Sequence, residues 1–419
     1  MRSLRSGGAP RHRAPRAPSR LLPLLAVSLL VGTSLAPPVV ANHGGRGIGS
    51  VLACDRPVEP PRCTSVGNDF LHYVVFDTSL SDGLAESLRD TMVEDYSPTK
   101  LHLIEQPEVT SSTDVIAFSG DFGDNGAAGW VYCPPDSPQG VSVRGDRWCQ
   151  RQELFFNLNP RFSIFFDDDA SRDHVTCHEL GHTVGLRHWG NPPESTGPSA
   201  STCLNGNTPN GPTSLHELDI DHINAYPYAF WPTPPGVEIS RAPGDALAAG
   251  AMIEATGTES PRSLDALVVA SDAVVHGRVV DVEEGRRFGP ASRQLAYAAV
   301  TVEVLERLSG AFPAAGERTL VLEVPLFDGP ASLSRLRDEM VGTQRILFLR
   351  NKGESAGDAG LGADAVAADA GFYRLTAFDS ELAVDGSVVW SLVEDASVLE
   401  AFDGRSLEDA LDELRGARR

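Results

Sequence analysis

The chain is poor in basic residues, and in lysine above all. Its 419 residues include 35 lysines and arginines against 57 acidic residues, which gives a formal net charge of −22. Only Lys100 and Lys352 are lysines. A chain this acidic repels nucleic-acid phosphates and anionic membrane surfaces. We therefore expect no nucleic-acid partner, while the charge by itself indicates nothing about catalysis.

Long apolar runs are scarce as well. The run over residues 21–31 is shorter than the roughly 20 apolar residues that a membrane-spanning helix requires. Residues 1–20 contain six arginines and no acidic residue, and the small residues Val39 and Ala41 come after the run. This order is typical of a secretory signal. We predict a signal peptide over residues 1–41 and a secreted, extracellular protein without a stable membrane span; the alternative is a membrane anchor.

Cysteine is missing from the second half of the chain, and no C-x-x-C pair occurs. That absence disfavours a cysteine-ligated zinc site, and an even number of cysteines in an exported chain favours disulfides. Six cysteines allow fifteen pairings. The simplest scheme pairs them in sequence order, as Cys54–Cys63, Cys133–Cys149 and Cys177–Cys203, with reactive free thiols as the alternative.

The length after Ala41 predicts two domains rather than one. Residues 42–68 form an N-terminal segment, and strand-like and helix-like runs alternate over residues 69–231. A proline-broken, small-residue stretch over residues 232–262 predicts a linker. Residues 263–419 are rich in strand-like runs and predict a compact β-barrel or sandwich flanked by helices. We expect an α+β protein in which residues 353–371 form a mobile loop.

The residues with the clearest chemistry lie over positions 178–188, which read HELGHTVGLRH. On a helix, residues four apart share a face, so His178 and His182 point toward one ion. Glu179 lies a quarter turn away and reaches a water on that ion without displacing a ligand. Gly185 permits the left-handed backbone that ends a helix, so that the chain turns and brings His188 to the same ion.

Three imidazoles with a fourth position open to water are typical of a catalytic zinc site, since structural sites have four protein ligands. Zinc lowers the pKa of its water and polarises a carbonyl, and Glu179 would take the water's proton and pass it to the leaving amine. The alternative is a helix whose histidines only cap it or face solvent.

These eleven residues match the pattern HExxHxxGxxH, and the chain thereby resembles the metzincin metallopeptidases, in particular their secreted, matrixin-like members. The resemblance implies a metzincin-like catalytic domain with a twisted mixed sheet and an active-site helix. It implies zinc bound by His178, His182 and His188, with Glu179 as the base. It also implies that substrates pair with an edge strand of the sheet, for which we propose residues 129–133.

Methionine is scarce, and this departs from the family pattern. The chain has four methionines, and none lies between His188 and Met252, where the family has a methionine-containing turn beneath the metal. Residues 201–205 occupy the place of that turn, with Leu204 where methionine is expected. Leucine has a similar volume and is apolar, so it would form the floor of the site at a small packing cost. A Cys177–Cys203 bridge would tie the metal-binding helix to this turn.

Two acidic clusters give weaker signals. Residues 167–169 are three aspartates, which would bind Ca²⁺ or form a solvated turn before a helix. A second metal site would be formed by His216, Glu217, Asp219, Asp221 and His222; the alternative is that these residues lie along the exposed face of the last helix of the domain.

The sequence thus predicts a secreted zinc-dependent endopeptidase, a monomer acting on a protein or peptide substrate through a zinc-bound water activated by Glu179. The alternative is a non-catalytic, secreted zinc-binding protein that keeps the same fold for adhesion. Retention of Glu179 beside the histidines favours the enzyme.

Overall fold

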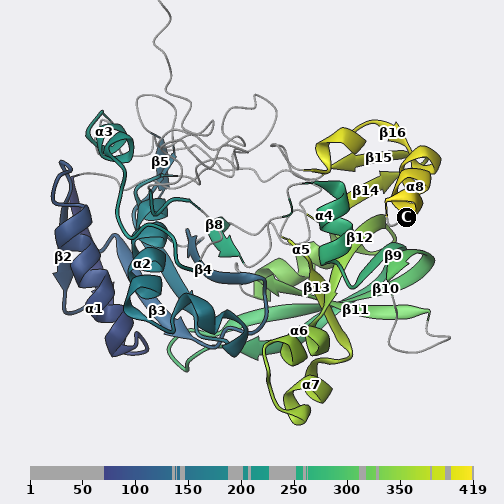
Figure 1. Cartoon of the computed structure of the whole chain (residues 1–419), viewed down its shortest axis with the longest axis horizontal. Coiled ribbons are helices and arrows are strands. Elements are labelled where there is room, and N and C mark those ends of the chain that lie inside the picture. The colour runs from purple at the N-terminus through teal and green to yellow at the C-terminus, as the bar shows by residue number, and fades with distance from the viewer. Residues whose placement is uncertain are drawn as a thin grey trace, which may run out of the picture. The chain divides into compact units, whose positions relative to one another are not determined.

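The structure is a computed structural model, and it contains two sheets with helices around them (Figure 1). The chain is therefore mixed α/β. Within the residues that the structure describes, no helix is both long and apolar enough to cross a membrane. The described residues are 70–134, 137, 139–141, 147–186, 202–205, 209–225, 252–257, 261, 263–310, 318–326, 330–377, 380–391 and 398–417. The predicted signal peptide and N-terminal segment lie outside them.

The first sheet has six strands in the order β2-β1-β3-β7-β4-β8. Strands β1, β2, β3 and β7 run parallel, β4 is antiparallel to β7, and β8 is antiparallel to β4. A separate short hairpin is formed by β5 and β6. The strands are β1 (Leu71–Phe76), β2 (His102–Gln106), β3 (Val115–Gly120), β4 (Ala127–Tyr132), β5 (Gln139–Val141), β6 (Arg147–Cys149), β7 (Gln152–Asn157) and β8 (Met252–Gly257).

Helices α1 (Asp82–Asp90) and α2 (Asp169–Thr183) pack together beside this sheet (Figure 1). The four-residue spacing of Leu84, Leu88 and Met92 predicts an apolar helix face, and all three side chains are buried in the core of this part. A π-helical turn, η2 (Thr91–Asp95), continues α1, and a 3-10 turn, η3 (Pro160–Phe165), precedes α2. Helix α3 (Glu217–Ala225) closes this part of the chain.

Strand β4 is not the exposed edge strand that residues 129–133 were expected to form. It lies between β7 and β8, and all six of its residues are buried. The expectation was wrong because the strand that covers its edge, β8, comes from residues 252–257, inside the stretch that the sequence indicates as a linker. The six residues of β8 include alanine and glycine, which are uncommon in strands, so their sequence gives little indication that they form one.

The second sheet closes on itself. Strand β13 pairs parallel with β11 and antiparallel with β12, which completes a ring in the order β9-β10-β11-β13-β12. Helix α5 lies in the chain between β11 and β12, which is the arrangement of an OB-type barrel. The barrel strands are β9 (Ala273–Phe288), β10 (Leu295–Gly310), β11 (Thr319–Leu326), β12 (Gln344–Asn351) and β13 (Phe372–Leu375), and β14 (Glu381–Asp385), β15 (Val388–Ser391) and β16 (Arg405–Ser406) extend the sheet from β12.

The predicted mobile loop over residues 353–371 is largely helical, so that expectation was wrong. Two short helices occupy it, and the side chain of Asn351 caps the first by accepting from the Glu354 N–H at 3.0 Å. Polar, alanine-rich helices without an apolar stripe give no periodic signal in the sequence. The helices of this part are α4 (Leu264–Ala270), α5 (Pro330–Met340), α6 (Lys352–Asp358), α7 (Ala363–Asp369) and α8 (Leu407–Gly416), with a 3-10 turn η5 (Glu400–Phe402).

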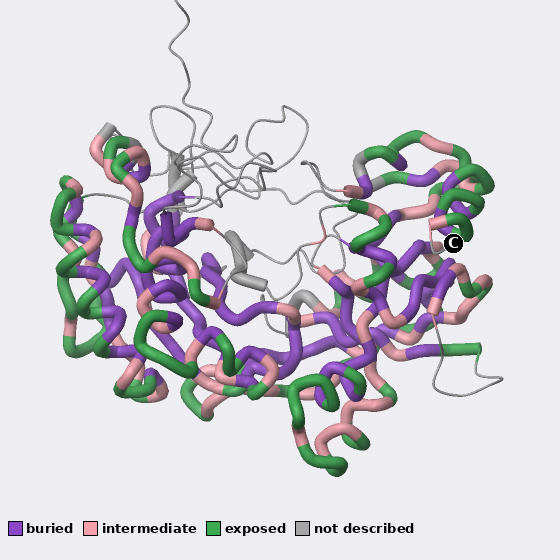
Figure 2. Tube along the Cα trace, viewed as in Figure 1, coloured by how far each residue is buried: buried purple, intermediate pink, exposed green. Residues whose placement is uncertain are grey.

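The β9–β10 hairpin packs on the first sheet. Phe288, Leu295 and Tyr297 join an apolar cluster with Trp130 and Phe155, and the Tyr297 hydroxyl donates to the Phe122 carbonyl at 2.6 Å. Trp130 and Phe155 stack with ring centroids 4.8 Å apart. Burial is continuous along β4 and β7 (Figure 2). The first sheet thus has its helices on one face and barrel residues against the other.

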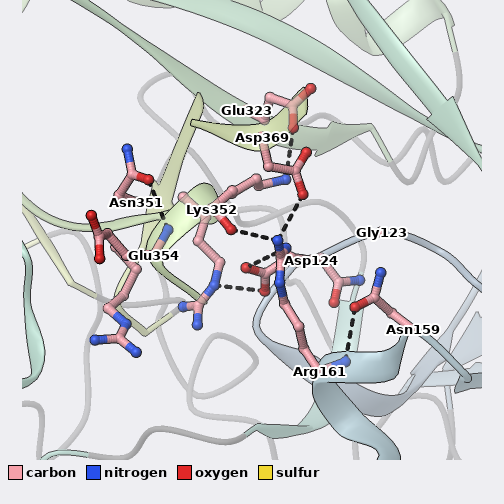
Figure 3. Close-up of polar contacts among 12 residues, drawn as sticks. Gly123, Asp124, Asn159, Arg161, Glu323, Asn351, Lys352, Glu354 and Asp369 are labelled. Atoms are coloured by element: carbon pink, nitrogen blue, oxygen red, sulfur yellow. Dashed lines mark hydrogen bonds and ion pairs between the residues drawn. The ribbon is translucent and has the colours of Figure 1, made fainter. Parts of the chain in front are cut away.

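A cluster of buried charges is drawn in Figure 3, and its Lys352 Nζ lies 4.7 Å from the ring centroid of Tyr297 in the apolar cluster. Asp124, from the loop after β3, pairs with Arg161 at 2.9 Å and with Arg374 of β13 at 2.8 Å. Burial raises the pKa of Asp124, but Arg374, Lys352 and Arg161 together hold it below its usual value. Lys352 pairs in turn with Glu323 at 2.7 Å. Opposite buried charges from the loop after β3 and from the barrel therefore compensate one another.

Candidate functional site

Helix α2 places the predicted site residues. His178, Glu179 and His182 are all fully buried on it. The helix begins after Asp168, whose carboxylate accepts from the Ser171 N–H at 2.7 Å and so caps the first turn. Within residues 167–169, Asp168 thus acts as a helix cap and Asp169 pairs with Arg172.

The end of α2 follows the sequence prediction for Gly185. Its φ is 86°, in the left-handed region. The Gly185 N–H donates to the His182 carbonyl and the Leu186 N–H to the Gly181 carbonyl, each at 3.0 Å. These two bonds form the Schellman motif, which is favoured by glycine at this position. The chain therefore turns back at the last turn of the helix, as the sequence predicts.

The two histidines on α2 have the same hydrogen-bond arrangement. Nδ1 of His178 donates to the Cys203 carbonyl at 2.7 Å, and Nδ1 of His182 donates to the Leu186 carbonyl at 2.8 Å. A carbonyl only accepts, so Nδ1 carries the proton in each ring. In the neutral ring Nε2 then keeps its lone pair. The ring centroids are 4.6 Å apart, which brings both side chains to one place.

This donor set fits zinc. Metal-binding histidines commonly donate their second nitrogen to a backbone carbonyl, which fixes the tautomer and the ring orientation. His188, the third predicted ligand, lies outside the described residues. Among the residues that the structure does describe, no group of three potential metal ligands comes together. The structure thus brings two of the three predicted ligands together.

The carboxylate of Glu179 lies against β4 at Gly129. A Cβ added to Gly129 would lie 2.6 Å from Oε1 of Glu179, closer than non-bonded atoms approach. An alanine at this position would therefore require the Glu179 side chain to move. Sequence reasoning missed this role of Gly129, because the contact joins a strand and a helix far apart in the chain.

The turn at residues 202–205 lies under the helix. Leu204 is fully buried, and its two methyl groups would lie 3.0 and 3.1 Å from a Cβ added to Gly181, between the two histidines. Thr202 donates to the carboxylate of Asp219 at 2.6 Å, and the Leu204 N–H donates to the Thr202 hydroxyl at 3.2 Å. Asp219 therefore holds the turn in place.

Asp219 was expected on an exposed helix face or in a second metal site. It is instead 2% exposed, and its carboxylate also accepts from the His216 N–H at 3.1 Å. The expectation of an exposed position was wrong. The polar character of Asp219 favoured exposure, but the sequence does not show that the hydroxyl of Thr202 pairs with its carboxylate inside the protein. The side chain of His222 lies outside the described residues.

Two disulfides are present among the described residues. Cys133 is bonded to Cys149, and Cys177 to Cys203. Both pairings were predicted, and the second ties α2 to the turn that carries Leu204. The third predicted pair, Cys54–Cys63, lies outside the described residues.

Buried polar side chains support the C-terminal half of α2 from the sheet. Gln152 donates to the Thr183 carbonyl at 2.7 Å, and Nε2 of His72 lies 3.1 Å from the Thr183 hydroxyl. That hydroxyl donates to the Leu180 carbonyl at 2.7 Å, so His72 is the donor in this pair. Burial lowers the pKa of His72 from 6.5 to about 4, and the ring is therefore neutral near pH 7.

His174 lies one turn before His178 and is also buried. Its Nδ1 donates to the Pro212 carbonyl at 2.7 Å, and its ring centroid lies 5.9 Å from that of His178. Burial lowers its pKa. It shares the tautomer of the two predicted ligands and so serves as a matched control for them.

Comparison with known proteins adds little. No family model matches the sequence, and no curated protein matches it. One solved structure with some similarity is high choriolytic enzyme 1, a hatching enzyme zinc-protease from the medaka fish Oryzias latipes. The identity is 13%, the match covers 38% of this chain and 88% of that one, and the TM-score is 0.23. A likeness of this size supports no conclusion, and the site is interpreted from its own residues.

Proposed function

We propose that the chain is a secreted, zinc-dependent endopeptidase. The observation that carries this proposal is the shared arrangement of His178 and His182, whose Nδ1 atoms are both engaged by backbone carbonyls beside the buried carboxylate of Glu179. Zinc held by these rings and by His188 would supply a Lewis acid toward the scissile carbonyl and toward water.

The histidines and Glu179 would have separate roles in this reaction. His178 and His182 would hold the metal in a fixed orientation, because their carbonyl partners lock the rings. Glu179 would act as the general base: it accepts the proton of the attacking water and then delivers it to the leaving amine. The burial of Glu179 keeps bulk water from competing at its carboxylate.

Zinc content and peptide cleavage, measured on the mature protein with and without a chelator, test the proposal. Glu179→Ala should retain zinc and lose turnover by at least about a hundredfold, in the range of general-base contributions. His182→Ala should lose both, whereas the control His174→Ala should keep zinc. Equal cleavage by Glu179→Ala and His182→Ala would contradict the mechanism.

A further inference from the structure

Strand β8 covers the edge of β4 that faces away from β7. In their antiparallel register, Gly129 lies opposite Thr256, Trp130 opposite Ala255, and Val131 opposite Glu254. Paired strands lie about 4.8 Å apart, so the main chain of β8 follows β4 at that spacing. Within the described residues β8 is the last strand of the sheet.

The register brings β8 to the candidate site. Gly129, opposite Thr256, is the residue that contacts the carboxylate of Glu179. The main chain of β8 also lies close to that of α2, in addition to its pairing with β4. A peptide chain on this edge therefore passes beside the proposed catalytic base.

An open strand edge binds an extended peptide through main-chain hydrogen bonds, with little dependence on its sequence. A peptide on the β4 edge would need the groups that β8 now uses. We propose, on the premise of the peptidase function above, that β8 is an intramolecular pseudosubstrate. It occupies the edge on which an extended polypeptide substrate pairs antiparallel to β4, and it keeps the enzyme latent.

A strand in the same chain is a strong competitor. Segment 258–263 joins β8 to α4, and a short tether of this kind gives an effective concentration on the order of millimolar. Substrate binds only to the fraction of molecules in which β8 has left the edge, so the apparent KM rises by the reciprocal of that fraction. At saturating substrate, β8 is displaced from the edge in all molecules, so kcat is the same as without β8. Release of β8 should therefore lower KM and leave kcat unchanged.

Proline substitutions test this on the full mature chain. N–H groups alternate along a strand, so Glu254→Pro with Ala255→Pro removes one donor to β4 whichever of the two faces it. The matched control, Glu254→Ala with Ala255→Ser, alters the same two side chains and keeps both N–H groups. We expect KM for an extended peptide to fall about tenfold or more in the proline variant, with kcat unchanged, and to stay unchanged in the control. Equal KM in the proline variant and the parent would overturn the proposal.

A binding measurement separates this proposal from the peptidase function. In a Glu179→Gln background, a labelled synthetic peptide with the sequence of residues 250–259 is titrated against each variant by fluorescence anisotropy. The proline variant should bind it at least about tenfold more tightly than the parent. If no variant with an intact Glu179 cleaves peptides but binding differs in this way, the proposed peptidase function is contradicted, while the proposal that β8 occupies the peptide-binding edge is supported. Equal binding overturns the occupancy.

A second variant covers the case in which the prolines prevent folding. Replacement of residues 252–257 by Gly-Ser-Gly-Ser-Gly-Ser keeps the tether length and weakens strand formation. It should show the same fall in KM, with a cooperative thermal transition. If neither variant folds, β8 is a structural strand and the proposal is overturned.

Discussion

Gly129 illustrates how one missing side chain positions another residue. Its Cα faces the carboxylate of Glu179 with no room for a methyl group, since a Cβ there would lie 2.6 Å from Oε1. Rotating Glu179 away would leave a buried carboxylate in a different position relative to the histidines. The strand therefore helps to fix the direction of the proposed base, a role that no motif in the sequence indicates.

Gly129→Ala should reduce kcat by about tenfold or more while zinc content stays unchanged, because small displacements of a positioned base are costly. Peptide cleavage and zinc analysis on the same preparation measure both quantities. The double variant with Glu179→Ala should cleave no more slowly than Glu179→Ala alone, since the methyl group acts through the carboxylate. A further loss in the double variant would point to a general disturbance of β4.

His72 makes the folded state sensitive to acid. Its pKa is about 4 in the folded protein against an ordinary value of 6.5, so the unfolded chain binds the proton more readily. The free energy of unfolding is therefore unaffected by protonation of His72 above pH 6.5, and it decreases as the pH falls from 6.5 toward 4. The loss amounts to about 3 kcal/mol at about 1.4 kcal/mol per pKa unit.

The variant His72→Gln isolates that effect, because the amide retains a donor for Thr183 and does not titrate. Chemical denaturation between pH 7 and pH 4 should show the parent losing stability relative to the variant by about 3 kcal/mol. A constant difference between the two proteins across this range would show that His72 does not carry the linkage.

At the scale of elements, the turn after α2 links helix termination to metal binding. Gly185 adopts φ 86°, and the chain after it turns back so that the Leu186 carbonyl accepts a hydrogen bond from Nδ1 of His182. Both the helix end and the orientation of a proposed ligand therefore depend on one backbone conformation.

Gly185→Ala should lower the free energy of unfolding by about 1 kcal/mol, the usual cost of a left-handed alanine. Zinc affinity should fall by about tenfold, as for loss of a partner behind a metal ligand. Gly342→Ala is the matched control, because Gly342 has φ 89° and an added methyl there meets no atom within 4 Å. It should show the stability loss alone; competition titration with a zinc chelator distinguishes the two.

Elements whose signal is local were predictable from the sequence. Helix α2 and its end at Gly185 followed from residue spacing. The two disulfides followed from chain order. Elements that depend on distant partners were not predictable. Strand β8 has no pattern of its own, and α6 begins at Lys352, whose buried charge is paired with the distant Glu323 of β11.

At the scale of the whole molecule, described residues on either side of the predicted linker, residues 232–262, contact one another. Residues of β9 and β10 cover Trp130 and Phe155 on the first sheet, and Asp124 is neutralised partly by Arg374 of the barrel. Each part therefore supplies groups that complete the other.

A fragment spanning residues 42–232 should consequently fold poorly. It would expose the face that carries Trp130 and Phe155, and burial of a phenylalanine side chain alone contributes about 1.5–3 kcal/mol. Size-exclusion chromatography and thermal unfolding should show aggregation or a transition well below that of the mature chain. A monomeric fragment with the parent's transition temperature would show that the barrel contributes nothing to the first sheet.

The Cys177–Cys203 bridge has a consequence for where the protein can work. Cys177 immediately precedes His178, and the Cys203 carbonyl is the acceptor that orients the same ring. In a reducing cytosol, thiols stay unpaired, and this ring would lose the covalent tie that holds its acceptor in place. For the secreted peptidase proposed above, the orientation of this ring would therefore be completed only after export.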